Sequence, residues 1–193
     1  MAKKRNWLTL LALLPLTLVI GAGEGGKVIQ GRVIALDKTK GTVTIIKDAK
    51  ADKDKPEYAL PPVTFTLPAT PGDMDPEPKA GKRIKLDVKA KQIIIFDTAS
   101  QNFKTLDYTL VDQKEGVDKE DPLVAGKKFP VVDQEKKAIT VYSPRQKILT
   151  AFSLPAEYLA LPPDTWDNGD EVTITYQEEG KAKKITNLSK PKK

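Results

Sequence analysis

Hydrophobic and polar positions alternate in short blocks along this chain, and the order of the blocks recurs. Residues 33–36 and 42–46 are rich in alternating β-branched side chains and flank a polar connector that ends at Gly41. This pattern predicts a β-hairpin, because alternation buries one face of each strand and glycine suits the turn. Residues 131–132 and 138–142 flank a similar polar connector, so the hairpin is predicted twice.

Both halves of the chain continue in the same order after this hairpin. A strand that ends in Leu-Pro-Ala, a proline-rich connector and a second hairpin follow in each half. The matching segments are 63–69 with 150–156, 70–78 with 161–166, 80–88 with 168–176, and 92–96 with 184–188. A break between the third and fourth of five strands is typical of the OB barrel. The sequence therefore predicts an all-β fold of two tandem OB-like five-stranded barrels, with a single β-sandwich as the alternative.

A further strand is predicted between the halves at residues 102–111, and a charged segment follows it at 112–122. Such a strand can pair with either barrel and join the two. The predicted organisation is a leader at 1–22, a first barrel at 24–99, a connecting strand and charged loop at 100–127, a second barrel at 128–189, and a basic tail at 190–193.

The first segment has the pattern of a bacterial secretory signal. Three basic residues near the start precede an apolar run at 7–20, and small residues follow it. The run is shorter than the roughly 20 residues that span a bilayer. We therefore expect an exported protein, either periplasmic or held at the membrane of the cell envelope.

The end of this leader resembles the lipobox of bacterial lipoproteins, in which a lipidated cysteine follows small residues. The resembling residues are Ile20, Gly21, Ala22 and Gly23, and Gly23 stands where the cysteine would be. Three interpretations remain open. The leader is cleaved after Ala22, or it stays as a weak membrane anchor, or the chain is a lipoprotein altered at one position.

Composition excludes several kinds of chemistry. The 193 residues contain no Cys and no His. Nucleophilic sites built on a Cys-His pair or a Ser-His-Asp triad are therefore impossible, as are zinc sites with thiolate or imidazole ligands. Carboxylate, lysine and tyrosine chemistry remains possible. We expect no cofactor, no metal site and no catalytic residue.

Two groups of residues are weak candidates for ligand binding. Asp112, Glu115 and Asp118 lie close together in the charged segment and faintly resemble a calcium loop, although Lys114 and Lys119 beside them oppose a cation. A solvated loop is the favoured interpretation of these acids. Tyr158 and Trp166 lie in the second proline-rich connector, where aromatic rings can stack on sugars, whereas a tryptophan that plugs the core is favoured for Trp166.

Two resemblances follow from these patterns. The blocks Gly-Thr-Val-Thr-Ile at 41–45, Phe-x-Leu at 65–67 and 152–154, and Gly-Asp-Glu-Val at 169–172 form a pattern that resembles the small OB barrel of periplasmic copper-efflux metallochaperones. That family holds copper through His, Met and Trp, and here Val63 and Phe65 occupy the third strand, so the resemblance implies the fold without the metal. With its lipobox-like leader and the segments 145–150 and 166–172, nearly the whole chain also resembles an uncharacterised family of small exported bacterial lipoproteins, which implies a location and no activity.

The sequence therefore predicts a non-catalytic envelope protein that binds a protein or glycan partner or serves as a structural module. A cell-wall hydrolase that uses carboxylates, or a carrier of a cation or small ligand, is the alternative. We expect no nucleic-acid partner, because such binding needs a basic stripe interleaved with exposed aromatic residues.

Overall fold

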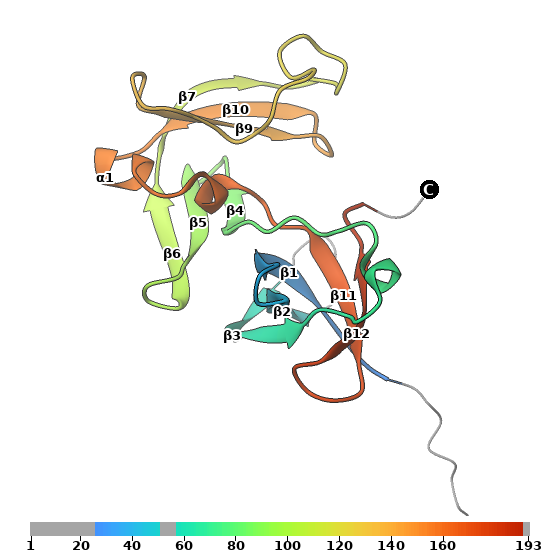
Figure 1. Ribbon diagram of the computed structural model, residues 1–193. Coiled ribbons are helices and arrows are strands. Elements are labelled where there is room, and N and C mark those ends of the chain that lie inside the picture. The colour runs from blue at the N-terminus through green and yellow to red at the C-terminus, as the bar shows by residue number, and fades with distance from the viewer. Residues whose placement is uncertain (1–25, 51–56, 191–193) are drawn as a thin grey trace, which may run out of the picture.

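The computed structural model describes residues 26–50 and 57–190 (Figure 1). The predicted leader, with the lipobox-like residues, lies outside the described residues, as does the predicted tail beyond Lys190. The described chain is all-β, as predicted, and helical turns occur only in its connectors. The strands are β1 (Lys27–Asp37), β2 (Thr42–Lys50), β3 (Glu57–Thr66), β4 (Arg83–Asp87), β5 (Gln92–Asp97), β6 (Asn102–Asp107), β7 (Thr109–Lys114), β8 (Val131–Asp133), β9 (Ala138–Ser143), β10 (Ile148–Ser153), β11 (Glu171–Tyr176) and β12 (Ala182–Asn187). The short helices are η1 (Pro71–Met74), α1 (Ala156–Leu159) and η2 (Pro163–Trp166).

These strands form three sheets in two lobes. One five-stranded sheet, with the order β12-β11-β1-β2-β3, makes the lobe that we call the lower lobe after its position in Figure 1. The sheets β4-β5-β6 and β7-β10-β9-β8 make the upper lobe. Every pairing within these sheets is antiparallel.

Both lobes bury the apolar face of their strands, and a third apolar cluster joins them. The lower core contains Val33, Ile45, Phe65 and Ile174. The upper core lies between its two sheets and contains Phe152 and Trp166, among others. The cluster between the lobes is formed by Ile34, Ile46 and Phe96, with Tyr58, Leu60, Ile84 and Phe103 against it.

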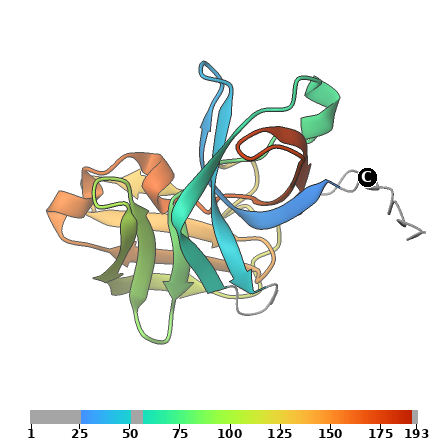
Figure 2. The same ribbon diagram turned by 90° about the horizontal axis from the view of Figure 1, so that it is seen from below.

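The two-barrel arrangement is not confirmed, because the last hairpins of the halves are exchanged. The hairpin β11–β12 comes from the predicted second barrel, yet β11 pairs with β1 of the lower lobe (Figure 2). The hairpin β4–β5 comes from the predicted first barrel, yet β5 pairs with β6 in the upper lobe. Among the described residues no sheet closes into a barrel, although one isolated parallel bridge between Thr66 and Lys181 connects β3 to the start of β12.

The segment predicted as one extra strand at 102–111 is two strands. It breaks at Tyr108, so that β6 belongs to one upper sheet and β7 to the other. The buried ring of Tyr108 packs against Phe152, with 5.0 Å between the ring centroids. The segment therefore joins the two upper sheets instead of joining two barrels.

The two connectors that lead to the exchanged hairpins cross at a pair of glycines. Gly81 lies just before β4 and Gly169 just before β11, and their neighbours Lys82 and Asn168 form an isolated antiparallel bridge. A Cβ on Gly169 would lie 1.9 Å from the carbonyl oxygen of Val33, and a Cβ on Gly81 would lie 2.5 Å from that of Asp167. Only glycine permits this backbone approach, which explains why both halves place a glycine at this point.

The repeated hairpin pattern comes from one turn that occurs five times in the part of the chain that the structure describes. Each turn has five residues, and its last residue has a positive φ between 50° and 63°. The turns are 37–41, 87–91, 97–101, 133–137 and 143–147. The first residue is Asp in four of them, and its Oδ1 accepts one or two backbone N–H groups of the turn. The sequence similarity of the first hairpins thus reflects local turn chemistry, which other hairpins of this chain share.

Candidate functional site

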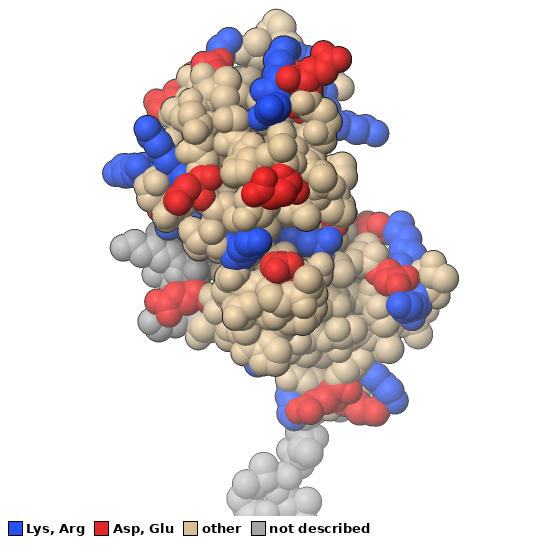
Figure 3. Space-filling view, turned by 90° about the vertical axis from the view of Figure 1, so that its left-hand side faces the viewer, with Lys and Arg blue, Asp and Glu red and all other residues tan. Residues whose placement is uncertain are grey.

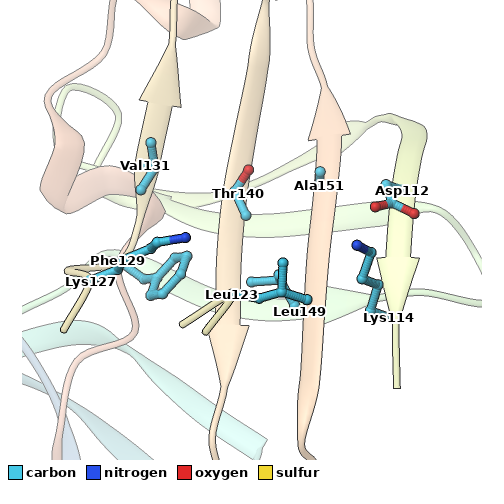
Figure 4. A pocket seen from close by; sticks show the side chains of 9 residues that line it. All are labelled: Asp112, Lys114, Leu123, Lys127, Phe129, Val131, Thr140, Leu149 and Ala151. Atoms are coloured by element: carbon cyan, nitrogen blue, oxygen red, sulfur yellow. The ribbon is translucent and has the colours of Figure 1, made fainter. Parts of the chain in front are cut away.

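A hollow of about 350 Å³ lies on the outer face of the sheet β7-β10-β9-β8 (Figure 4). We call it the trough. The residues that line it are Asp112, Lys114, Leu123, Lys127, Phe129, Val131, Thr140, Leu149 and Ala151. They come from all four strands of the sheet and from the loop that precedes β8.

The register of the strands explains how the trough floor is built. Thr140 of β9 lies opposite Val131 of β8 and opposite Ala151 of β10, and Ala151 lies opposite Asp112 of β7. Four side chains therefore cross the sheet in one row. The neighbouring positions Ile139, Val141 and Phe152 point into the upper core, since side chains alternate between the faces of a strand. The two central residues of the row, Thr140 and Ala151, have small side chains, so space remains above the sheet at this point.

A second row and a loop make the walls. Leu149 lies opposite Lys114 and Tyr142. The loop at 115–130 folds over this end of the sheet and is held there by contacts with Tyr142 of β9. The Tyr142 hydroxyl donates to the carbonyl oxygen of Val117 at 2.9 Å, and the ring of Phe129 lies 5.8 Å from that of Tyr142 between centroids. The wall is thus a fixed part of the fold.

Aliphatic side chains reach the surface in and around the trough. Leu123 is 36 % exposed and Val131 is 43 % exposed, and Val111 on the edge strand β7 is 58 % exposed. Asp112, Lys114 and Lys127 surround this apolar surface with charge. An exposed apolar surface with a polar rim is typical of a site that binds another molecule.

The predicted acidic candidates do not converge on one point. Asp112 lines the trough, whereas Glu115 accepts a hydrogen bond from Gln113 at 3.1 Å and Asp118 pairs with Lys147 at 2.6 Å. Within residues 26–50 and 57–190, no group of three or more acids could hold a metal ion. The three acids therefore take part in separate interactions.

The predicted aromatic candidates lie away from the trough. Trp166, at the end of η2, has no exposed surface and belongs to the upper core, so it plugs the core and offers no ring face to a ligand. Tyr158 on α1 is half-buried against the same core, and the ammonium of Lys104 lies 4.9 Å from its ring centroid.

Sequence reasoning missed the apolar residues of the trough, above all Phe129, Leu149 and Val131. A signal was present, because β10 has apolar residues at successive positions, Ile148 and Leu149, and then Ala151 and Phe152. Such a strand has little polar surface on either face. The sequence could have indicated a second apolar face, although it could not say which loop borders it.

A smaller hollow of about 300 Å³ lies on the lower lobe between η1 and β12. Asp73 and Asp75 line one side, and Lys184 and Leu188 line the other. The charges on the face shown in Figure 3 are interspersed, with small groups of both signs. That face lacks the continuous basic stripe that is typical of nucleic-acid binding.

The sequence matches a family model described as "Domain of unknown function (DUF4881)" over residues 24–192. The chain belongs to the DUF4881 family. The DUF4881 match includes both lobes and the exchanged hairpins, so the family model covers the whole described fold. It confirms the expectation of an uncharacterised family. No curated protein matches the chain, and no solved structure matches it. Within the described residues of this DUF4881 chain, no helix has the length and apolar character that crossing a membrane requires.

Proposed function

We propose that this protein is a non-catalytic binding module of the bacterial cell envelope, which holds a segment of a protein partner in the trough. The observation that carries the proposal is the row of Asp112, Ala151, Thr140 and Val131 across four strands, bordered by a loop that its own bonds hold in place. A preformed, mostly apolar hollow with a few charged groups is the usual form of a binding site. The location rests on the leader-like pattern of residues 1–22.

The side chains of the trough favour a protein segment over a glycan. Sugar rings stack on flat aromatic faces, and Phe129 is half-buried against Tyr142. The remaining apolar surface is aliphatic and is supplied by Leu123, Val131 and Leu149. Two lysines stand against one aspartate on the rim, so the complementary segment carries aliphatic side chains and net negative charge.

A non-catalytic role is supported by the small number of acids that line the trough. A hydrolase that works through carboxylates needs two of them roughly 5 to 10 Å apart in a cleft. Asp112 is the one acidic residue among those that line the trough. A single carboxylate beside Lys114 can orient a bound segment, but it does not supply both an acid and a base.

A crosslinking experiment tests the proposal in the producing cell. A photo-reactive amino acid at Thr140 should give a crosslinked product of defined mass, because this position lies on the trough floor. The same probe at Thr64, which is exposed on β3 of the lower lobe, is the matched control and should give none. The substitution Ala151→Arg fills the floor and should remove the product from the Thr140 probe.

Binding by the purified proteins then decides the class of partner. The crosslinked partner should bind the unmodified chain, and Ala151→Arg should weaken this binding at least tenfold, or about 1.4 kcal/mol. Equal crosslinking from Thr140 and Thr64 would contradict a trough site. A rise in melting temperature with peptidoglycan fragments, lost in Ala151→Arg, would instead assign the trough to a glycan, because a ligand of the folded state stabilises it.

A further inference from the structure

A polar cluster lies at the junction of the two lobes, apart from the trough. It is formed on the outer face of the lower sheet by Arg32 of β1, Asp48 of β2, Tyr58 of β3 and Glu171 of β11. Arg32 lies opposite Glu171 in the strand register, and Asp48 lies opposite Tyr58. We call these four residues the junction cluster.

Arg32 joins the lobes through this cluster. Its Nη1 donates to the carbonyl oxygen of Ile84 in β4 at 3.0 Å and to Oδ1 of Asn168 in the crossing connector. Its Nη2 lies 3.6 Å from Oε2 of Glu171. The guanidinium carbon also lies 5.2 Å from the ring centroid of Tyr58. One side chain therefore connects the lower sheet to an upper sheet and to the exchanged hairpin.

Each acid of the cluster has one carboxyl oxygen with a polar partner and one without a hydrogen-bond partner. Oδ2 of Asp48 accepts a hydrogen bond from Gln30 at 2.7 Å, and Oε2 of Glu171 faces Arg32. Oδ1 of Asp48 and Oε1 of Glu171 are buried and have no hydrogen-bond partner among the described residues. The side chains of the two acids lie within hydrogen-bonding reach of each other. Two ionised carboxylates cannot hydrogen-bond, whereas one proton between them satisfies both oxygens.

The charges around Glu171 favour that proton. Burial and the negative charge of Asp48 raise the pKa of Glu171 to about 7, although Arg32 opposes the shift. Burial also raises the pKa of Tyr58, so its phenol stays neutral. In the upper lobe, Arg83 of β4 interacts electrostatically with Arg32 and with Asp167. In the lower lobe, Asp170, which precedes β11, is paired with Lys190, which follows β12. The junction cluster therefore has one cation, Arg32, against two acids.

We propose that Asp48 and Glu171 share one proton in mildly acidic solution, and that this shared proton is a pH-sensitive lock between the lobes. With the proton in place, Arg32 balances a single negative charge and keeps its bonds to β4 and the connector. Loss of the proton puts two half-buried negative charges beside one guanidinium and weakens the junction. This inference is independent of the function proposed for the trough.

The pH dependence has a definite sign. The pKa of Glu171 is raised from 4.5 to about 7 in the folded chain, so the folded state holds its proton more tightly than the unfolded state does. The stability that the proton contributes is present below about pH 4.5, falls as the pH rises to about 7, and is lost above that value.

The test follows the carboxyl carbon of Glu171 by NMR in the full chain as the pH is raised, with Glu171→Gln to assign the signal. We expect a midpoint near 7, and a midpoint near the ordinary 4.5 would overturn the proposal. Asp48→Asn should lower this midpoint, because it removes the negative neighbour, whereas an unchanged midpoint would contradict the shared proton. The wild-type titration decides the matter even if a variant fails to fold.

Melting temperatures give the second readout. Glu171→Gln keeps a neutral polar group, so the melting temperature of the wild type relative to this variant should fall between pH 4.5 and 7 and level off above. The matched control is Glu135→Gln, an exposed acid in the turn 133–137, whose difference from the wild type should stay constant over this range. Parallel profiles for the wild type and Glu171→Gln would overturn the lock.

Discussion

The two lobes differ in how their strands are drawn from the chain. The strands of the upper lobe, β4 to β10, are consecutive, whereas the lower sheet combines β1, β2 and β3 with β11 and β12 from the other end of the chain. The upper lobe therefore forms from contacts that lie closer together in sequence. The lower lobe must bring the chain ends together, and that loop closure costs entropy before any contact forms. The lower lobe therefore depends on a distant segment of the chain for its folding, whereas the upper lobe is built from one continuous segment.

The largest effect should come from removing the exchanged hairpin. Deletion of residues 171–193 takes β11 and β12 from the lower sheet and leaves Val33, Ile45 and Phe65 without Val172, Ile174 and Ile185. We expect the lower lobe to unfold while the upper lobe persists. In a chain that begins at residue 24, Trp166 is the only tryptophan, so its emission should stay that of a buried ring, while amide NMR signals of β1 to β3 lose their dispersion. Exposure of Trp166 would show that the lobes fold as one unit.

Gly169→Ala should weaken the crossing between the lobes strongly. Its Cβ would lie 1.9 Å from the carbonyl oxygen of Val33, and a backbone atom cannot move aside as a flexible side chain can. We expect a loss of more than about 3 kcal/mol in the free energy of unfolding, near the upper end for single substitutions. Urea denaturation gives the value. The control is Gly72→Ala, where nothing lies within 4 Å of the new Cβ, and it should change stability by less than about 0.5 kcal/mol.

Truncation of one core ring in each lobe measures how far the lobes are coupled. Phe65 is 2 % exposed in the lower core, and Phe152 is fully buried in the upper core. Each change to alanine should cost about 3 to 5 kcal/mol. Because the upper lobe is expected to persist without the lower one, Phe65→Ala should speed hydrogen exchange in the lower lobe, and faster exchange in both lobes would contradict this expectation. Exchange that accelerates in β1 to β3 alone would show separate units.

The smallest effects should come from the repeated turn. Lys137 has a φ of 50° at the position where the first hairpin has Gly41 at 63°. Lys137→Gly removes the left-handed strain of a side chain and should raise stability by about 0.5 to 1 kcal/mol. Gly41→Ala should lower it by a similar amount. Thermal melts of the two variants check the prediction, and a loss in Lys137→Gly would contradict the matching of the two turns.

Much of the local structure could be read from the sequence. Alternation located the hairpins and the buried faces, and polar connectors such as the one that ends at Gly41 marked the chain reversals. Of the candidate residues, Asp112 lies at the trough, although its sequence pattern suggested a calcium loop, and Phe129 and Leu149 were missed because the trough depends on which loop covers the sheet. In the sequence, Glu171 has the pattern of an ordinary strand residue, because nothing along the chain shows that Asp48 faces it.

The sequence by itself determined the hairpins, their buried faces and their turns, because alternation and turn chemistry act over a few neighbouring residues. Only the tertiary structure decided which hairpin completes which sheet. Val172 and Ile174 of β11 alternate as Ile93 and Ile95 of β5 do, so either hairpin suits either core by its pattern. The choice is made where Gly81 and Gly169 let the connectors cross, and that is a contact between segments far apart in the chain.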